Sequence, residues 1–492
     1  MSEALAPRLP RKVKLLYGLG SIAIGAKTAM LGMILFYYSQ VVGLRPDLVG
    51  LALGISLFVD AFWDPLIGQF SDNLRTRWGR RHPLMYASAI PIAISFWALF
   101  NPPEGLSDME LFSYLLGLIL TVRFFTSFYE VPSTALAPEL APDYHDRTVV
   151  LSYRWLFGAL GTGITSVLAY GYFFRPTPEY PIGQLNPAGY GPLSTTISVV
   201  LLLAILISAL GTHHRIPQFH QPAQRNPTLW ETLREIGSTL KNWNFGVSVT
   251  AGLIFGMSIG LYSGLALYFA TYFWELPASN VLVLAIAQLI SAPIAASVGP
   301  WLSRLWGKRR ACMTMFFAGV MLTGLPIFLR LIGFFPENGS PWLVPILTAD
   351  RLLSGILNTG GFIVVSSMIA DITEESQLKT GRRSEGLLQS ADSILQKSVS
   401  GLSALLPGLI LAFIDFPTKA QPGTVPQETL QMLGWIYLPA TVTLSLLSIS
   451  TWRFYRIDQA THERNLAGVR EQTAAAEARI EATDVAPDRA PT

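Results

Sequence analysis

The sequence VDAFWDPLIGQFSDNLRTRWGRR, residues 59–81, contains the pattern that decides the fold. It begins inside an apolar run that opens near Leu48, and two acidic residues, Asp60 and Asp64, lie four positions apart within that run. The chain then becomes densely basic within a few residues. A carboxylate at the centre of a membrane helix costs about 2.5–3.5 kcal/mol on insertion scales, so acidic residues are rare there and usually have a function. The stretch therefore predicts a membrane helix that carries two functional acids and ends at a basic loop.

Composition and hydropathy extend this prediction to the whole chain. Of its 492 residues, 51% are hydrophobic and 14% are charged, whereas a soluble protein usually has about 25% charged residues. A membrane-spanning helix needs roughly 20 mostly apolar residues. Twelve segments meet this condition, near residues 15–42, 48–70, 83–101, 110–137, 149–173, 192–212, 246–273, 280–302, 311–333, 342–370, 386–414 and 429–454. The predicted fold class is an all-α membrane protein with twelve transmembrane helices.

An internal repeat relates the two halves of the chain at an offset of 228 residues. The repeat joins corresponding points of the predicted helices and loops: Gly18 with Gly246, Pro65 with Pro293, Gly79 with Gly307, Arg80 and Arg81 with Lys308 and Arg309, Arg123 with Arg351, and Asp143 with Asp371. Two six-helix pseudo-repeats in the same orientation are the layout of the major facilitator fold. We expect an N-terminal six-helix bundle at residues 15–212 and a C-terminal six-helix bundle at residues 246–456.

The distribution of lysine and arginine predicts the orientation. The loops expected on one side contain only Arg45, Arg175 and Lys419, and the other basic loop residues fall on the opposite side. Because basic loops remain in the cytoplasm, both termini are expected there, in a multi-pass protein of the cell (inner) membrane. Residues 1–14 would be a cytoplasmic N-terminus. Residues 213–245 would be a cytoplasmic linker with an amphipathic helix, and residues 457–492 a mobile cytoplasmic tail.

The two acids of the second span suggest a cation site. Asp60 and Asp64 have the i,i+4 spacing that places them on one helix face. Two carboxylates so close in a low dielectric cannot both ionise comfortably without a cation, so they suit binding of Na⁺ or a proton. Glu130 joins them if the fourth span packs on the second, and Ser127 adds a hydroxyl one turn earlier. The alternative is a set of structural salt bridges, for instance with Lys27 or Arg154.

Several basic and polar residues are expected to line a central cavity. Lys397 shares a polar stripe with Ser390, Ser393 and Ser400 on the eleventh span, and its repeat partner is Ala169. We interpret Lys397 as a positive group of the second half that compensates the negative charge of the carboxylates of the first half across the central cavity. Arg351, Ser354 and Asn358 form a similar stripe on the tenth span. Further candidates for the substrate cavity are Lys27, Arg123, Thr134 and Arg154.

The basic blocks RTRWGRR and RLWGKRR have two compatible interpretations. They hold the orientation of the chain, and Asp72, Arg80 and Arg81 are candidates for conformational gating through ion pairs with neighbouring helix ends. The six histidines fall in predicted loops or the tail, and no metal site is expected. The short loops contain no nucleophile–histidine–acid set and no phosphate loop, so an enzyme is not expected. The net charge of +3 gives no argument for nucleic acid.

At these residues the chain resembles a known family. DAFWDPLIGQFSDNLRTRWGRRHP, YEVPSTALAPEL followed by DYHDRT, and MIADITEESQLKTGRRSEG are similar to the glycoside–pentoside–hexuronide:cation symporters, the melibiose-permease-like branch of the major facilitator superfamily. The resemblance covers residues from about 14 to 415. It implies that Asp60 and Asp64 bind the coupling cation with help from Ser127 and Glu130, and that Arg154 and Lys397 are functional cavity residues.

Three positions depart from the family pattern. The first span reads GSIAIGAK, without the acid that contacts sugar in melibiose transporters, and Thr134 stands where a tryptophan is expected. Both departures argue against a galactoside. Trp63 replaces the asparagine before the second aspartate, which leaves H⁺ as well as Na⁺ as the coupling ion.

The sequence thus predicts a secondary symporter of a sugar or glycoside, acting as a monomer by alternating access. It needs no cofactor besides the coupling ion. An amphiphile such as a lysolipid or steroid is an alternative substrate, and a membrane receptor or scaffold is an alternative function.

Overall fold

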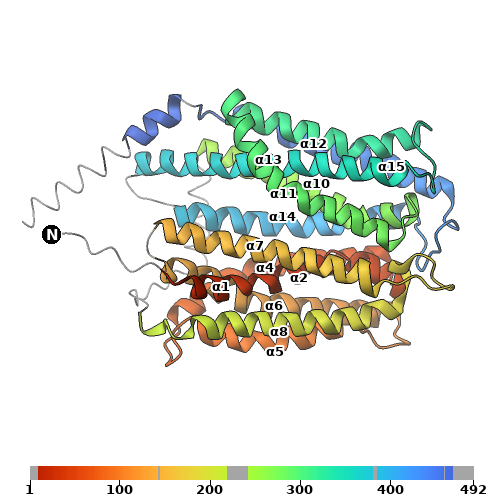
Figure 1. Cartoon of the computed structure of the whole chain (residues 1–492), viewed down its shortest axis with the longest axis horizontal. Coiled ribbons are helices and arrows are strands. Elements are labelled where there is room, and N and C mark those ends of the chain that lie inside the picture. Colours follow the sequence, from red (N-terminus) through yellow and green to blue (C-terminus); the bar gives the residue numbers. More distant parts are fainter. Residues whose placement is uncertain are drawn as a thin grey trace, which may run out of the picture.

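The computed structural model describes residues 9–141, 144–218, 242–380, 385–458, 460–468 and 472. It contains twelve helices that are long and apolar enough to cross a membrane, which run side by side along the longest axis (Figure 1). The all-helical, twelve-span fold predicted from the sequence is confirmed.

Six spans form the first half. The first span consists of four consecutive helical pieces that break near Gly20 and Gly32, and the others are single long helices. The bounds are α1 Arg11–Leu19, α2 Ser21–Leu31, α3 Ile34–Phe36 and the π-helix η1 Tyr37–Val42, then α4 Pro46–Asn73, α5 His82–Leu99, α6 Asp108–Leu140, α7 Tyr144–Leu168 with the π-helix η2 Ala169–Phe173, and α8 Tyr190–His213.

The second half also contains six spans, and its first span is one long helix with a π-helix at its end. Its bounds are α10 Trp243–Tyr268 with the π-helix η6 Phe269–Phe273, α11 Ala278–Trp306, α12 Lys308–Leu331, α13 Leu343–Thr380, α14 Glu385–Phe413 and α15 Gln427–Thr451. The amphipathic helix expected in the linker lies outside the described residues. Within the predicted tail, residues 460–468 are helical, and Asp458 caps their start by accepting a hydrogen bond from the Thr461 N–H at 2.9 Å. The mobility of the tail stays a prediction.

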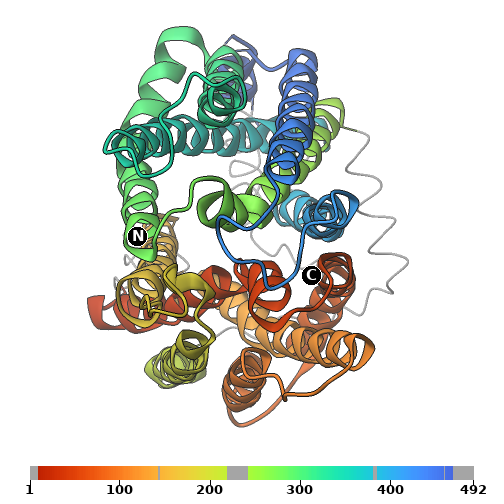
Figure 2. The ribbon, with the colours of Figure 1, turned by 90° about the vertical axis from the view of Figure 1, so that its right-hand side faces the viewer.

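The two halves meet along α4 of the first half and α14 of the second, which pack against each other over much of their length. Viewed end on, the first half lies below and the second half above (Figure 2). Glycines permit the close approach: a Cβ at Gly408 would lie 2.3 Å from the Pro46 carbonyl oxygen, and one at Gly401 would lie 2.8 Å from that of Gly54. Small residues at such contacts are a general solution for helices in membranes.

We call the end of the bundle at which α1 begins and α8 ends the near end, and the opposite end the far end. At the far end, polar groups bond across the halves. The Tyr272 hydroxyl donates to Oε1 of Gln40 at 2.8 Å, and Ser39 shares a hydrogen bond with Tyr268. The Gln184 amide donates to the Leu276 carbonyl at 2.9 Å. The far end is therefore sealed by hydrogen bonds between the halves.

Ion pairs at the near end have a different pattern. Lys14 pairs with Asp146 at 2.6 Å within the first half, and Lys308 pairs with Asp371 at 2.7 Å within the second. These pairs brace each half separately. The structure therefore represents a state that is closed at its far end. Each of the described near-end ion pairs lies within one half, so it can persist when the two halves move relative to each other.

Candidate functional site

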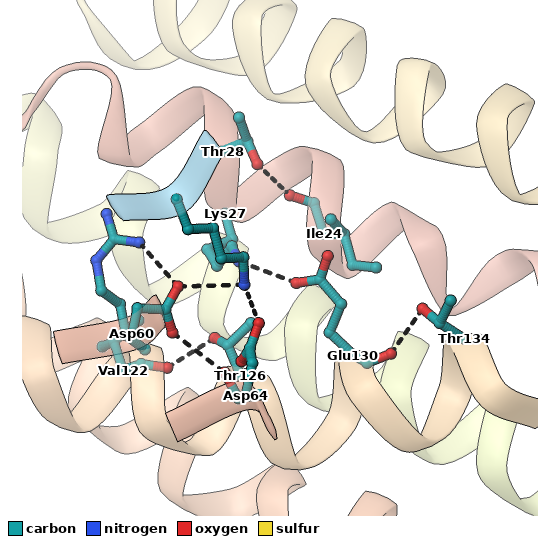
Figure 3. A network of polar contacts seen from close by, with 12 residues as sticks. Ile24, Lys27, Thr28, Asp60, Asp64, Val122, Thr126, Glu130 and Thr134 are labelled. Atoms are coloured by element: carbon teal, nitrogen blue, oxygen red, sulfur yellow. Dashed lines mark hydrogen bonds and ion pairs between the residues drawn. The ribbon is translucent and has the colours of Figure 1, made fainter. Parts of the chain in front are cut away.

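The two acids of α4 lie at the boundary between the halves, near the middle of the bundle. Asp60, labelled together with Asp64 in Figure 3, is only 6% exposed. Its Oδ1 accepts a hydrogen bond from the Ser127 hydroxyl of α6 at 3.2 Å. This places two of the expected ligand groups together. Asp64 lies one turn further along α4, and its Oδ1 is buried without a hydrogen-bond partner among the described residues. The site thus has an unused oxygen.

Two cations from different helices contact these acids. Lys397 of α14 bonds Oδ2 of Asp64 and lies 3.4 Å from Oδ2 of Asp60. Arg123 of α6 lies 3.7 Å from the same Asp60 oxygen and donates from Nε to the Ser56 hydroxyl at 3.0 Å. Two carboxylates and two cations make the cluster neutral. Because Lys397 comes from the second half, the cluster also joins the halves.

Glu130 contacts a different cation from the one shared by Asp60 and Asp64. Its carboxylate lies 3.7 Å from Nζ of Lys27 on α2, and its backbone carbonyl accepts a hydrogen bond from Thr134 at 2.8 Å (Figure 3). Of the four residues expected to form the cation site, three are therefore brought together, and the fourth is held by a lysine of the first span. This second pair matches the salt-bridge alternative that the sequence left open.

Arg154 of α7 makes only neutral contacts among the described residues. Its guanidinium donates to the Tyr17 hydroxyl at 2.8 Å, to the Ser133 hydroxyl at 3.0 Å and to the Thr134 hydroxyl at 2.9 Å. Neither Tyr17 nor Ser133 was expected in the site. Thr134 thus contacts Arg154, and the role of both residues in a substrate cavity stays a prediction.

Arg351 and Asn358 of α13 line a cavity of about 290 Å³ inside the second half. The cavity wall also includes Tyr262 of α10, Gln288 of α11, Val320 of α12 and Tyr437 of α15, so five helices contribute to it. The polar stripe expected on the tenth span thus lines this cavity, whereas the side chains of Ser390 and Ser393 lie outside the described residues.

The candidate gating residues form one network at the near end. Arg81 pairs with Asp72 at 2.6 Å, and Arg80 and Arg81 lie 2.6 Å and 3.2 Å from Glu139 at the end of α6. The expected pairing with neighbouring helix ends is present. All these groups belong to the first half, so the network braces that half, and its role in gating stays a prediction.

One group of side chains has the composition of a metal site, although none was expected. Ligand atoms of Asp371, Glu374 and His462 lie within 4.8 Å of one another. Lys308 already contacts both Asp371 oxygens at 2.7 and 2.8 Å. An ammonium group in that position opposes a second cation, so we interpret the cluster as an attachment of the helix at 460–468 to the end of α13.

Chemically, the central cluster can exchange one cation for another. Carboxylate and hydroxyl oxygens are the ligands that hard monovalent cations prefer, and a carboxylate can equally take a proton. In this structure the Lys397 ammonium occupies that position. An added cation or proton would compete with Lys397, because it would reduce the negative charge that attracts the Lys397 ammonium.

Comparison with known proteins gives concordant matches. The sequence pattern described as MFS/sugar transport protein matches residues 16–459. The isoprimeverose transporter of Lactiplantibacillus pentosus is 25% identical over 92% of this chain and 90% of its own. A protein of Escherichia coli named as a glycoside/cation symporter is 23% identical over 93% and 94% of the two chains. The inward-open structure of the xylose transporter XylE from E. coli superposes with a TM-score of 0.60 at 15% identity, covering 92% of this chain and 98% of that one, which supports the fold alone.

Proposed function

Because the chain belongs to the family of MFS/sugar transport proteins, we propose that it is a secondary transporter that couples the movement of Na⁺ or H⁺ to symport of a sugar or glycoside. Transport proceeds by alternating access, in which the two halves open first at one end and then at the other. The amphiphile substrate and the receptor function are not favoured, because the relatives are named for sugar transport and symport.

The observation that carries this proposal is the contact of Lys397 with Asp60 and Asp64 across the halves. When the site holds no ion, Lys397 neutralises the carboxylates and ties α14 to α4. When a cation or proton binds, the attraction between Lys397 and the acids falls, and the tie weakens. Ion occupancy and the relative position of the halves are thereby linked, which is what coupling requires.

The proposed ion-binding groups divide into direct and supporting roles. Asp60, Asp64 and Ser127 supply the oxygens, and Arg123 holds Asp60 by a contact of 3.7 Å. Glu130 acts through Lys27, which it holds at 3.7 Å. Lys27, Thr134 and Arg154 lie on the same side of the first half as candidates for solute contact.

The orientation follows from the basic loops, which put the near end in the cytoplasm of a cell with the transporter in its inner membrane. With the far end sealed, this structure then corresponds to a state that faces inward. One monovalent charge moving across about 100 mV supplies roughly 2.3 kcal/mol, and this is enough for an accumulation of nearly fiftyfold.

The test is solute uptake by proteoliposomes with an imposed Na⁺ or pH gradient, across a panel of neutral glycosides and amphiphiles. We expect one gradient to drive accumulation of a glycoside, and Asp60→Asn and Asp64→Asn to abolish accumulation while the protein stays folded. Asp47→Asn is the matched control, since Asp47 lies at the start of the same helix and pairs with Arg45 at 2.6 Å. If both site variants still concentrate the solute, the site assignment is wrong.

A further inference from the structure

Three spans of the second half meet at one exposed surface of the near end. Trp243 begins α10, Arg309 is the second residue of α12, and the short helix η7 Trp452–Phe454 follows α15. Hydrogen bonds connect these points. Nε1 of Trp243 donates to the Phe454 carbonyl at 3.0 Å, and Nη1 of Arg309 donates to the Tyr455 carbonyl at 3.1 Å. The side chains at this surface therefore have defined positions relative to one another.

Three arginines belong to this surface. They are Arg309, Arg453 of η7 and Arg456, which follows η7, and all three residues are exposed. The guanidinium carbon of Arg456 lies 4.8 Å from the centre of the Trp243 ring, a cation–π contact that holds the charge over the aromatic surface. Among the described residues, none of the three arginines pairs with a carboxylate.

The acids near this surface have partners of their own. The contacts are Asn244 Nδ2 with Glu375 at 2.9 Å, Lys308 with Asp371 at 2.7 Å, His462 with Glu374 at 3.0 Å, and the Thr461 N–H with Asp458 at 2.9 Å. An exposed group of cations without an acidic partner attracts anions from its surroundings. The surface is therefore complementary to a negatively charged group that comes from outside the described chain.

The same surface lies where the spans leave the membrane. Trp243 is the first residue of one span and Phe454 the last residue of another, and these residues are 52% and 60% exposed. Tryptophan collects where the hydrocarbon meets the lipid headgroups, because its ring is apolar and its N–H is polar. Arginine side chains near helix ends extend to the headgroups as well. The three arginines therefore lie at the depth of the lipid phosphates.

We propose that this surface, formed by Trp243, Arg309, Arg453, Phe454 and Arg456, binds the phosphate headgroup of an anionic phospholipid in the leaflet at the near end. Guanidinium groups form paired hydrogen bonds with phosphate oxygens, and the two aromatic rings pack against the acyl chains beside the headgroup. A zwitterionic headgroup carries its own cation, which the arginines repel. This lipid site goes beyond the proposed transport function, because it involves neither the coupling ion nor the solute.

The test compares two lipids that have the same acyl chains. The purified full chain in detergent is equilibrated with equal amounts of dioleoyl phosphatidylglycerol and dioleoyl phosphatidylcholine, and the bound lipids are identified by native mass spectrometry. We expect the first bound lipid to be phosphatidylglycerol with a preference of about tenfold or more. Equal retention of the two lipids would overturn the proposal.

Variants then assign the preference to the arginines. The triple variant Arg309→Gln, Arg453→Gln and Arg456→Gln should abolish the preference, whereas the corresponding triple lysine variant should retain most of it, because lysine keeps the charge. The double variant Arg453→Gln and Arg456→Gln leaves the bond of Arg309 to the Tyr455 carbonyl intact. It should still reduce the preference at least about fivefold.

The control removes the same charge from other exposed positions at the near end. It is the triple variant Arg11→Gln, Lys12→Gln and Arg464→Gln, and it should leave the preference unchanged. An equal loss in this control and in the arginine triple variant would show attraction to the overall charge, and would overturn the site. So would an unchanged preference in the arginine triple variant. Displacement of the bound phosphatidylglycerol by excess inorganic phosphate would identify a site for free phosphate, which also contradicts the lipid assignment.

Discussion

Nζ of Lys397 lies 3.4 Å from Oδ2 of Asp60, although the two residues are 337 positions apart and belong to different halves of the molecule. This contact makes the ion site part of the joint between the halves. A change of charge on either side of the contact therefore acts on the conformation as well as on ion binding.

The first prediction concerns Lys397 itself. Lys397→Gln removes the group that competes with the coupling ion and ties the halves together, so ion binding should persist while coupling fails. We expect accumulation against a gradient to fall at least about tenfold, with downhill movement of solute retained. Uptake and equilibrium exchange in proteoliposomes measure the two effects. Lys12→Gln, at an exposed position near the start of α1, should alter neither. Undiminished accumulation by Lys397→Gln would contradict the proposed link.

The second prediction concerns the far-end seal. The Lys419 N–H donates to the Ser39 carbonyl at 3.3 Å, so the two backbones are in direct contact across the halves. Ser39→Cys with Lys419→Cys, in a Cys312→Ala background, should cross-link on oxidation and stop transport. Reductant should restore transport. The two single cysteine variants are the controls, and an oxidised double variant that still transports would show that the seal does not open during the cycle.

The third prediction concerns the glycine contact of α4 with α14. A side chain at Gly401 meets the Gly54 carbonyl at 2.8 Å, so Gly401→Val should hold the helices apart and favour opening of the far end. A cysteine introduced at Ser39, buried in this structure, should then react faster with a polar thiol reagent. Gly117→Val is the control, because a Cβ at Gly117 has nothing within 4 Å. Equal labelling rates in the two variants would contradict the prediction that the close contact at Gly401 keeps the far end closed.

The fourth prediction concerns stability at the near end. Glu139 is bonded by Arg80 and Arg81, and its side chain is only 12% exposed. Glu139→Ala leaves Arg80 without its acid and Arg81 with Asp72 as its remaining acidic partner, so it should lower the free energy of unfolding by about 3 kcal/mol. Arg45→Ala breaks a pair whose arginine is 64% exposed, and it should cost less than about 1 kcal/mol. Thermal denaturation in detergent compares the two. A larger loss for Arg45→Ala would reverse our ranking of the two pairs.

Much of the fold could be predicted because membrane helices must satisfy their own backbone hydrogen bonds and be apolar for their whole length. Hydropathy was therefore sufficient to predict the twelve spans. Some predicted span ends differ from the observed helix ends by several residues, where polar caps extend a helix. One example is α6, which begins at Asp108 because Ser107 and Glu110 form a capping box. The repeat gave the division into halves, since it aligned loops as well as helices.

The pairing of charges could be predicted only in part. Spacing along one helix placed Asp60 and Asp64 on a common face, and a cation in the second half was expected to face them. Which helix packs beside which acid depends on rotation and tilt, and periodicity does not contain that information. The contact of the Glu130 carboxylate with Lys27 could not be predicted for this reason, and the part of Glu130 in the ion site stays a prediction. The role of Tyr17 as a partner of Arg154 was missed for the same reason.

The far-end seal has a kinetic consequence. An empty transporter that rests in this state must break the bonds of Gln40, Tyr268 and Tyr272 before its binding site can meet fresh solute from outside. In contrast, a loaded transporter carries an ion that has already loosened the Lys397 tie. Return of the empty form should then limit turnover, and swapping labelled for unlabelled solute across the membrane should run faster than net uptake.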